Sequence, residues 1–84
     1  MEQRKKHSYT ILAIGWFGTI LLILAYTLNS FGLIPSQGFW YPVLNLLAAV
    51  LLGVRVYADR NYANTFLEIF WGGVAIVSLV SLFL

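Results

Sequence analysis

Residues 9–28, with the sequence YTILAIGWFGTILLILAYTL, decide the fold, because they are twenty consecutive positions without a charged side chain. Two further apolar runs follow. The second covers about residues 40–58 and is interrupted only by Arg55, and the third covers about residues 66–84 with Glu68 as its single acid. A helix needs about 20 mainly apolar residues to cross a bilayer, where every backbone group must be hydrogen-bonded within its own segment. We therefore predict an all-α protein, a single domain over residues 1–84 with three transmembrane helices.

The composition excludes most classes of soluble protein. Of the 84 residues, 61% are hydrophobic and only 10% are charged, and the mean hydropathy is +0.85. An ordinary soluble domain carries about 25% charged residues. A chain as apolar as this one would expose large apolar patches to water, which soluble monomers avoid. We therefore expect a lipid bilayer to surround it.

The chain also lacks the residue clusters on which enzymes and metal sites depend. It has no cysteine, which excludes disulfides, thiolate metal sites and thiol nucleophiles. Its single histidine, His7, has no neighbouring acid or cysteine. We expect no catalytic residue, no metal and no cofactor, and therefore no enzyme. The net charge of +2 indicates membrane orientation and not nucleic-acid binding, so no nucleic-acid partner is expected.

The positions of the charges predict how the chain crosses the membrane. All the basic residues lie near the N-terminus or around the junction of the second and third apolar runs, namely Arg4, Lys5, Lys6, Arg55 and Arg60. Residues 29–41 and the C-terminal end carry no charge. Because basic residues stay on the cytoplasmic side, we expect a cytoplasmic N-terminus and a C-terminus outside. The first run is longer than the apolar core of a signal peptide, about 7–15 residues, so we expect it to be retained.

Small and weakly polar residues recur at helical spacing in each apolar run. They are Gly15 and Gly18 in the first run, Asn45, Ala49 and Gly53 in the second, and Gly72, Ala75 and Ser78 in the third. Helices in lipid associate through small residues, which let backbones approach, and through polar groups that bond across helices. Two interpretations follow: these faces pack the three helices against one another, or at least one of them contacts a further copy or a foreign subunit.

Three polar residues inside the apolar runs are candidates for specific interactions. Arg55 and Glu68 are equally distant from the turn between the second and third runs. In an antiparallel hairpin they would lie at the same depth, and we predict an ion pair between them. The alternative is that each acts separately, with Glu68 closing a capping box with Thr65. Asn45 is expected to bond another helix or a polar ligand.

Two short motifs carry a resemblance to a known family. They open the second and third apolar runs as Tyr41-Pro42-x-x-Asn45-Leu46 and Leu67-Glu68-x-x-Trp71. With these motifs the chain resembles a group of uncharacterised small bacterial proteins with three spans, over nearly its whole length from Ile14 onward. The resemblance implies the bacterial inner (cytoplasmic) membrane as the location and implies no activity.

A second similarity, in size and number of spans, is to the SemiSWEET half-transporters. Two features of this chain depart from that family. The Pro-Gln pair expected in the first helix is absent, because the stretch reads Ala25-Tyr26-Thr27-Leu28. The basic connector follows the second span and not the first, which implies the opposite orientation. The sugar-binding residues of that family are therefore not transferred to this chain.

These observations leave two main hypotheses for function. The first is an accessory or structural subunit of a larger membrane assembly, such as an energy-converting or pigment complex, that docks through its Gly/Ala helix faces. The alternative is a minimal homo-oligomeric transporter or channel, with Asn45, Ser78 and Ser81 lining a polar path. The expected partners are the lipid bilayer and either other membrane subunits or copies of the same chain.

Overall fold

The computed structural model describes residues 9–84 and contains three helices. They are α1 (Tyr9–Ser30), α2 (Trp40–Ala58) and α3 (Tyr62–Ser81), and no strand occurs in this part of the chain. All three are long and apolar enough to cross a membrane, because 22, 19 and 20 residues correspond to about 33, 28 and 30 Å of helix. The predictions of an all-helical fold and of three such helices are confirmed. The basic residues at positions 4–6 lie outside the described residues.

The start of α3 differs from the sequence prediction. The helix begins at Tyr62 and not near residue 66, because Asn61 caps it: the side-chain oxygen of Asn61 accepts a hydrogen bond from the Asn64 backbone N–H at 3.3 Å. The Thr65 hydroxyl donates to the Asn61 carbonyl at 2.9 Å. Thr65 and Glu68 are therefore interior residues of α3, and the predicted capping box is wrong.

The first helix is terminated by a glycine in the loop that follows it. Gly32 has a φ of +77°, in the left-handed region that favours glycine. Its N–H donates to the Asn29 carbonyl at 3.0 Å, and the Leu33 N–H donates to the Leu28 carbonyl at 2.9 Å. This pair of bonds is a Schellman motif, which satisfies the last carbonyls of α1.

The second helix ends with the same pair of bonds but without a glycine. Arg60 adopts a φ of +61°, and its N–H donates to the Tyr57 carbonyl at 2.9 Å. The Asn61 N–H donates to the Val56 carbonyl at 2.9 Å. The left-handed conformation costs a non-glycine residue roughly 1–2 kcal/mol, so the turn between α2 and α3 is locally strained at Arg60.

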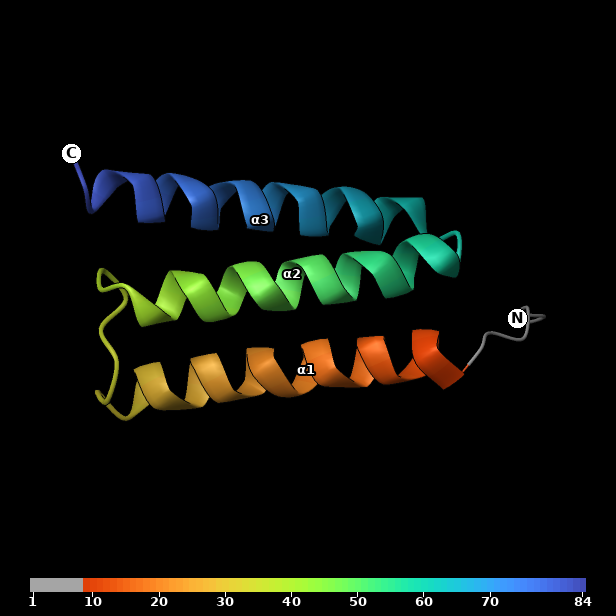
Figure 1. Ribbon diagram of the computed structural model, residues 1–84, viewed down its shortest axis with the longest axis horizontal. Coiled ribbons are helices and arrows are strands. Elements are labelled where there is room, and N and C mark those ends of the chain that lie inside the picture. The colour runs from red at the N-terminus through yellow and green to blue at the C-terminus, as the bar shows by residue number, and fades with distance from the viewer. Residues whose placement is uncertain (1–8) are drawn as a thin grey trace.

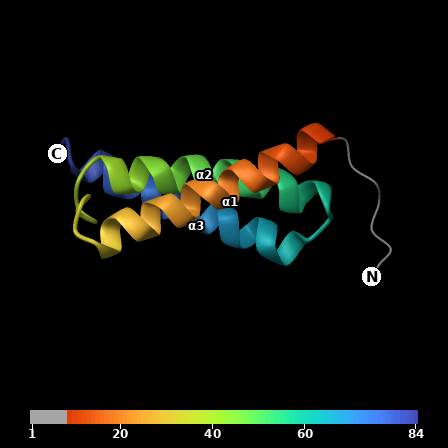
Figure 2. The ribbon, with the colours of Figure 1, turned by 90° about the horizontal axis from the view of Figure 1, so that it is seen from below.

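The helix α2 lies between α1 and α3 and contacts both of them. Within residues 9–84, the backbones of α1 and α3 do not approach each other, and the helices form a row (Figure 1). The view from below shows α1 inclined to α2 (Figure 2). The start of α1 and the α2–α3 turn lie at one end of the row, which we call the turn end. The α1–α2 loop and the end of α3 lie at the other, which we call the loop end (Figure 1).

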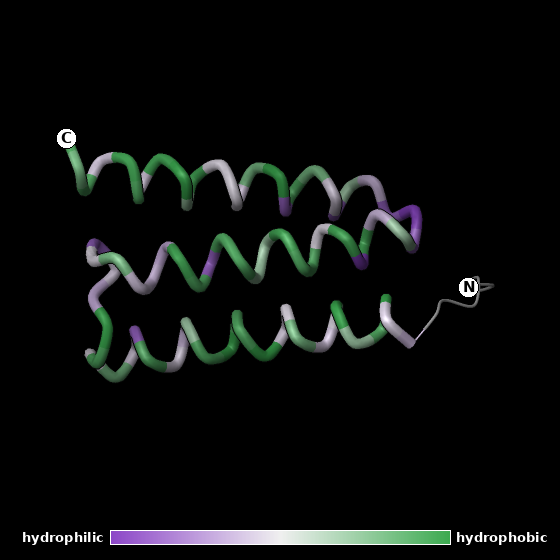
Figure 3. Tube along the Cα trace, in the orientation of Figure 1, coloured by the Kyte–Doolittle hydropathy of each residue, from purple (hydrophilic) through white to green (hydrophobic). Residues whose placement is uncertain are grey.

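Small residues alone form the interior of this row. In the described part of the chain the buried residues are Gly15, Gly18, Ala25, Pro42, Ala48, Ala49, Gly72 and Ala75, and no large side chain is fully buried. Hydrophobic residues predominate along all three helices and hydrophilic ones gather in the α2–α3 turn (Figure 3). The helices are therefore joined by close backbone approach, and their large apolar side chains are half-buried or exposed.

Candidate functional site

The seam between α1 and α2 is built around two glycines. A Cβ atom added at Gly18 would lie 2.9 Å from the Leu51 Cβ and 3.1 Å from the Leu52 backbone nitrogen. A Cβ atom added at Gly15 would lie 2.9 Å from the Cγ of Arg55. Real Cβ atoms essentially never approach other atoms to less than 3.0 Å. Both glycines are therefore required by the contact between the two helices.

Arg55 belongs to this α1–α2 seam. Its side chain crosses Gly15, and its Nε donates to Asp59 Oδ2 at 3.1 Å, where Asp59 is the residue that caps the end of α2. Both side chains are 22% exposed. The structure thus pairs this guanidinium with the C-cap residue of its own helix.

The ion pair predicted between Arg55 and Glu68 does not form. Glu68 faces Gly53 on α2, where an added Cβ would lie 3.5 Å from the Glu68 Cβ. Gly53 and Arg55 are two positions apart, which is about 200° around a helix with 3.6 residues per turn. The two charged residues share a depth, but they face opposite sides of α2.

The seam between α2 and α3 uses most of the remaining small residues. A Cβ added at Gly72 would lie 3.7 Å from the Ala49 Cβ, which is ordinary van der Waals contact. Ala75 is buried in the same seam, and Ser78 and Gly53 are half-buried. The structure therefore uses the predicted small-residue faces mainly to pack the chain's own helices.

One glycine that the sequence patterns did not single out lies outside both seams. Gly73 is exposed, and nothing lies within 4 Å of a Cβ atom added there. Its neighbour in the sequence, Gly72, is buried. The two glycines differ in exposure because they point to different sides of α3. Helical spacing from Glu68 identifies Gly72, whereas no sequence signal identifies Gly73.

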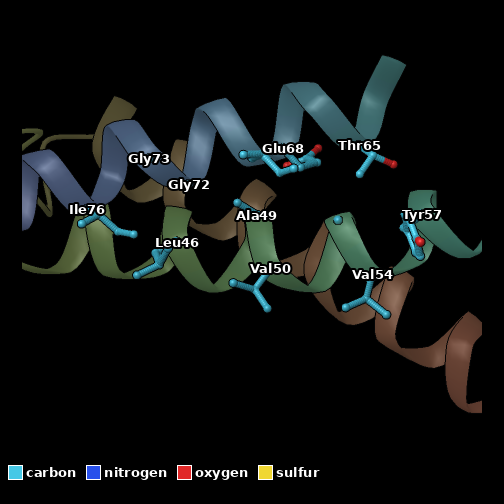
Figure 4. A pocket seen from close by; sticks show the side chains of 12 residues that line it. Leu46, Ala49, Val50, Val54, Tyr57, Thr65, Glu68, Gly72, Gly73 and Ile76 are labelled. Carbon is cyan, nitrogen blue, oxygen red and sulfur yellow. The ribbon is translucent and has the colours of Figure 1, made fainter. Parts of the chain in front are cut away.

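An apolar groove of about 580 Å³, which we call the glycine groove, follows the α2–α3 seam. It is lined by Leu46, Ala49, Val50, Gly53, Val54, Tyr57, Thr65, Glu68, Ile69, Gly72, Gly73 and Ile76. No residue of α1 lines it, so it opens on the side of the seam away from α1. Glu68 is its one charged residue and lies on the side of α3 that faces α2 (Figure 4).

Two adjoining cavities, which we call the acceptor groove, lie on the other side of the same seam. The first, about 170 Å³, is lined by Leu22, Asn45, Ala48, Ala49, Leu52, Leu67, Glu68 and Trp71. The second, about 270 Å³, is lined by Ser36, Tyr41, Pro42, Asn45, Trp71, Val74, Ala75 and Ser78. Because they share Asn45 and Trp71, the acceptor groove runs from Glu68 towards the loop end.

Asn45 is held by its own helix. Its Nδ2 donates to the Tyr41 carbonyl at 2.8 Å, so the amide nitrogen makes no bond to another helix in the described residues. A carbonyl accepts hydrogen bonds only from the nitrogen of an amide, which fixes the orientation of the side chain. The Oδ1 atom of Asn45 is therefore an acceptor in the acceptor groove.

Glu68 lies at the boundary between the two grooves. It is six residues beyond Tyr62, so it is about 9 Å along the axis of α3 from the start of the helix. The side chain is half-buried, and within residues 9–84 its carboxylate makes no ion pair or hydrogen bond. No group of three or more His, Cys, Asp or Glu in the described residues could hold a metal ion. The arrangement is an isolated acid beside apolar surfaces, amide and hydroxyl oxygens and the indole of Trp71.

Of the three comparisons with known proteins, only the one with protein families finds a match. A family model matches residues 11–84. No curated protein and no solved structure matches.

Proposed function

The chain belongs to the uncharacterised family whose model matches residues 11–84, and we propose that it is a small multi-pass subunit of a larger assembly in the bacterial inner membrane. The lengths of the three helices support a membrane location, since about 30 Å of apolar helix spans the hydrocarbon core. An energy-converting or pigment complex is the kind of assembly that such a subunit would join. In this proposal its role is structural and not enzymatic.

The proposed orientation places the turn end in the cytoplasm. Both described basic residues, Arg55 and Arg60, lie towards this end, and basic residues are retained on the cytoplasmic side. Reporter fusions at Gly38 and Leu84 should therefore report an outside location and a fusion at Asn61 a cytoplasmic one. A cytoplasmic signal at Leu84 would contradict the proposed arrangement of three spans.

Gly73 is the observation that carries the proposal of a docking partner. A glycine inside a helix costs roughly 1 kcal/mol relative to alanine, and the chain's own packing makes no use of this one. Glycine lets the backbone of a second helix approach closely in lipid. The glycine groove around Gly73 is apolar and open, so the partner we propose there is an apolar transmembrane helix of another subunit.

The test compares two substitutions on exposed faces of α3. Gly73→Leu fills the glycine groove without a clash inside the chain, whereas Val77→Leu changes a residue that is 68% exposed and lines neither groove. After extraction from the native membrane in a mild detergent, the native mass of the wild type should include other subunits. Gly73→Leu should lose them and Val77→Leu should keep them. A Gly73→Leu chain that retains the same partners would exclude docking at this groove.

The acceptor groove favours a second candidate function, a homo-oligomeric transporter or channel. It brings Asn45 and Ser78 to one cavity, and the Ser81 hydroxyl donates to the Ser78 carbonyl at 2.8 Å. Asn45 and Ser78 are two of the three residues expected to line a polar path, and the third, Ser81, lines neither cavity of the acceptor groove. A stable homo-oligomer without foreign subunits in the same native mass measurement would favour this function over the accessory role.

A further inference from the structure

The acceptor groove combines a carboxylate, an amide oxygen and an indole along one side of the α2–α3 seam. These groups are Glu68, Asn45 and Trp71, and all three line the same cavity of about 170 Å³. We propose that the acceptor groove is a binding site for a small organic monocation, an amine whose ammonium group lies at Glu68 and against the ring of Trp71.

The charge of the ligand follows from the surroundings of Glu68. An acid within an apolar helix is costly and is normally paired with a cation or a hydrogen-bond donor. Arg55 faces the opposite side of α2 and is engaged by Asp59. Arg60 is exposed in the α2–α3 turn. No cationic side chain of the described residues therefore reaches the acceptor groove. We infer that a bound ligand supplies the positive charge that pairs with Glu68.

The other groups in the groove select an ammonium with a hydrocarbon body. Because Asn45 donates its nitrogen to the Tyr41 carbonyl, it offers an oxygen to the ligand, and that oxygen accepts N–H groups. An indole is the best aromatic surface for a cation. Leu22, Leu52 and Leu67 complete the cavity and provide apolar walls for the carbon skeleton.

The size and opening of the groove restrict the ligand further. Sites for drug-sized ligands occupy about 300–1,000 Å³, whereas the cavity at Glu68 is about 170 Å³ and the adjoining one about 270 Å³. The site therefore fits a small amine. The second cavity is lined by Ser36, Tyr41 and Ser78, which gives a polar ligand a path from the loop end to Glu68.

This site is distinct from the proposed docking surface, although Glu68 and Ala49 line both grooves. The glycine groove lies on the other side of the α2–α3 seam and contains neither Asn45 nor Trp71. A substitution at Gly73 should therefore change the partner without changing the affinity for the cation. The two proposals can fail independently.

The probe is benzylammonium, and its matched neutral control is benzyl alcohol. The full chain, in nanodiscs of zwitterionic lipid, is titrated with each compound while NMR follows the side-chain carboxyl carbon of Glu68 and the indole nitrogen of Trp71. Benzylammonium should shift both signals with one saturation curve, and benzyl alcohol should leave the Glu68 carboxyl signal unchanged. No saturable shift in the wild type, or equal saturation by the alcohol, would overturn the proposal.

Variants then assign the contacts. Glu68→Gln should weaken benzylammonium binding by about ten-fold or more, and Trp71→Leu by about five-fold, the size expected for a cation–π contact. Asp59→Asn removes an acid outside the groove, and Gly73→Leu alters the other groove, so both should keep the wild-type affinity. Unchanged binding by Glu68→Gln would refute the assignment. Should that variant not fold, the wild-type titration still decides, together with Glu68→Asp, which must retain binding.

Discussion

Substitution of Gly18 by alanine should force the backbones of α1 and α2 slightly apart and destabilise their contact. The added Cβ would lie 2.9 Å from the Leu51 Cβ and 3.1 Å from the Leu52 backbone nitrogen. Neither atom is the free end of a flexible side chain, so a rotamer change cannot relieve the contact. Ordinary contacts of a Cβ begin at 3.4 Å, and the two backbones must therefore move apart by about half an ångström.

The expected loss is large enough to measure. Overpacking of a tight contact costs about 1–3 kcal/mol, and the gain from replacing a helical glycine by alanine is at most about 1 kcal/mol. Gly18→Ala should therefore reduce the free energy of unfolding by about 1–2 kcal/mol. Two glycines of α3 provide matched controls, because an added Cβ meets nothing within 4 Å at Gly73 and only ordinary contacts at 3.7 Å at Gly72.

The assay is reversible unfolding in mixed micelles with increasing sodium dodecyl sulfate, followed by far-ultraviolet circular dichroism. Gly73→Ala and Gly72→Ala should be as stable as the wild type or slightly more stable. Gly18→Ala should unfold at a lower detergent fraction with the same helical content before unfolding. If Gly18→Ala proved as stable as Gly73→Ala, the close approach of α1 and α2 at this position would be refuted.

Three further outcomes follow from the turn end. The changes in stability from Arg55→Gln and Asp59→Asn should be non-additive in a double-mutant cycle, because these two residues are in contact. The loss from Arg55→Gln and the gain expected from Glu68→Gln should simply add, and the reverse pattern would restore the ion pair expected from depth alone. Arg60→Gly should raise the midpoint of thermal unfolding by relieving a left-handed residue, worth about 1 kcal/mol, and a lower midpoint would show that the arginine side chain stabilises the turn. Asn61→Ala should cost about 1 kcal/mol in the same scan through loss of the cap, and an unchanged midpoint would mean that the cap contributes nothing.

The length of the apolar runs was sufficient to predict the three helices, but not where the third begins. Apolar residues become continuous only at Phe66, whereas α3 begins at Tyr62. A helix starts where a cap satisfies its free N–H groups, and Asn61 supplies that cap in a polar stretch. The Asn61 side chain was the signal in the sequence that a search for apolar runs does not use.

The sequence predicted how far each charged residue lies along its helix. It did not predict towards which neighbouring helix the side chain points. Arg55 and Glu68 are equally far from the turn, which suggested a pair. Arg55, however, follows Ala48 by seven positions and Leu52 by three, so these residues share one face of α2. That face contacts α1, and the assignment of faces to neighbours depends on α2 being the central helix. Nothing in the local sequence states which helix is central.

Glu68 should lower the free energy of unfolding of the chain, as expected of a residue whose role is to bind a ligand. Within residues 9–84 the Glu68 carboxylate makes no bond to the protein, yet it occupies an apolar helix, where an acid costs up to about 3 kcal/mol at the membrane centre. At its actual position near the end of α3, replacement by glutamine should raise the free energy of unfolding by about 1 kcal/mol in the same micelle assay while it removes cation binding. A gain in stability together with a loss of binding is the pattern of a functional residue that the fold does not need. A loss of stability in Glu68→Gln would instead mean that the carboxylate holds α3 against α2, and its role would then be structural.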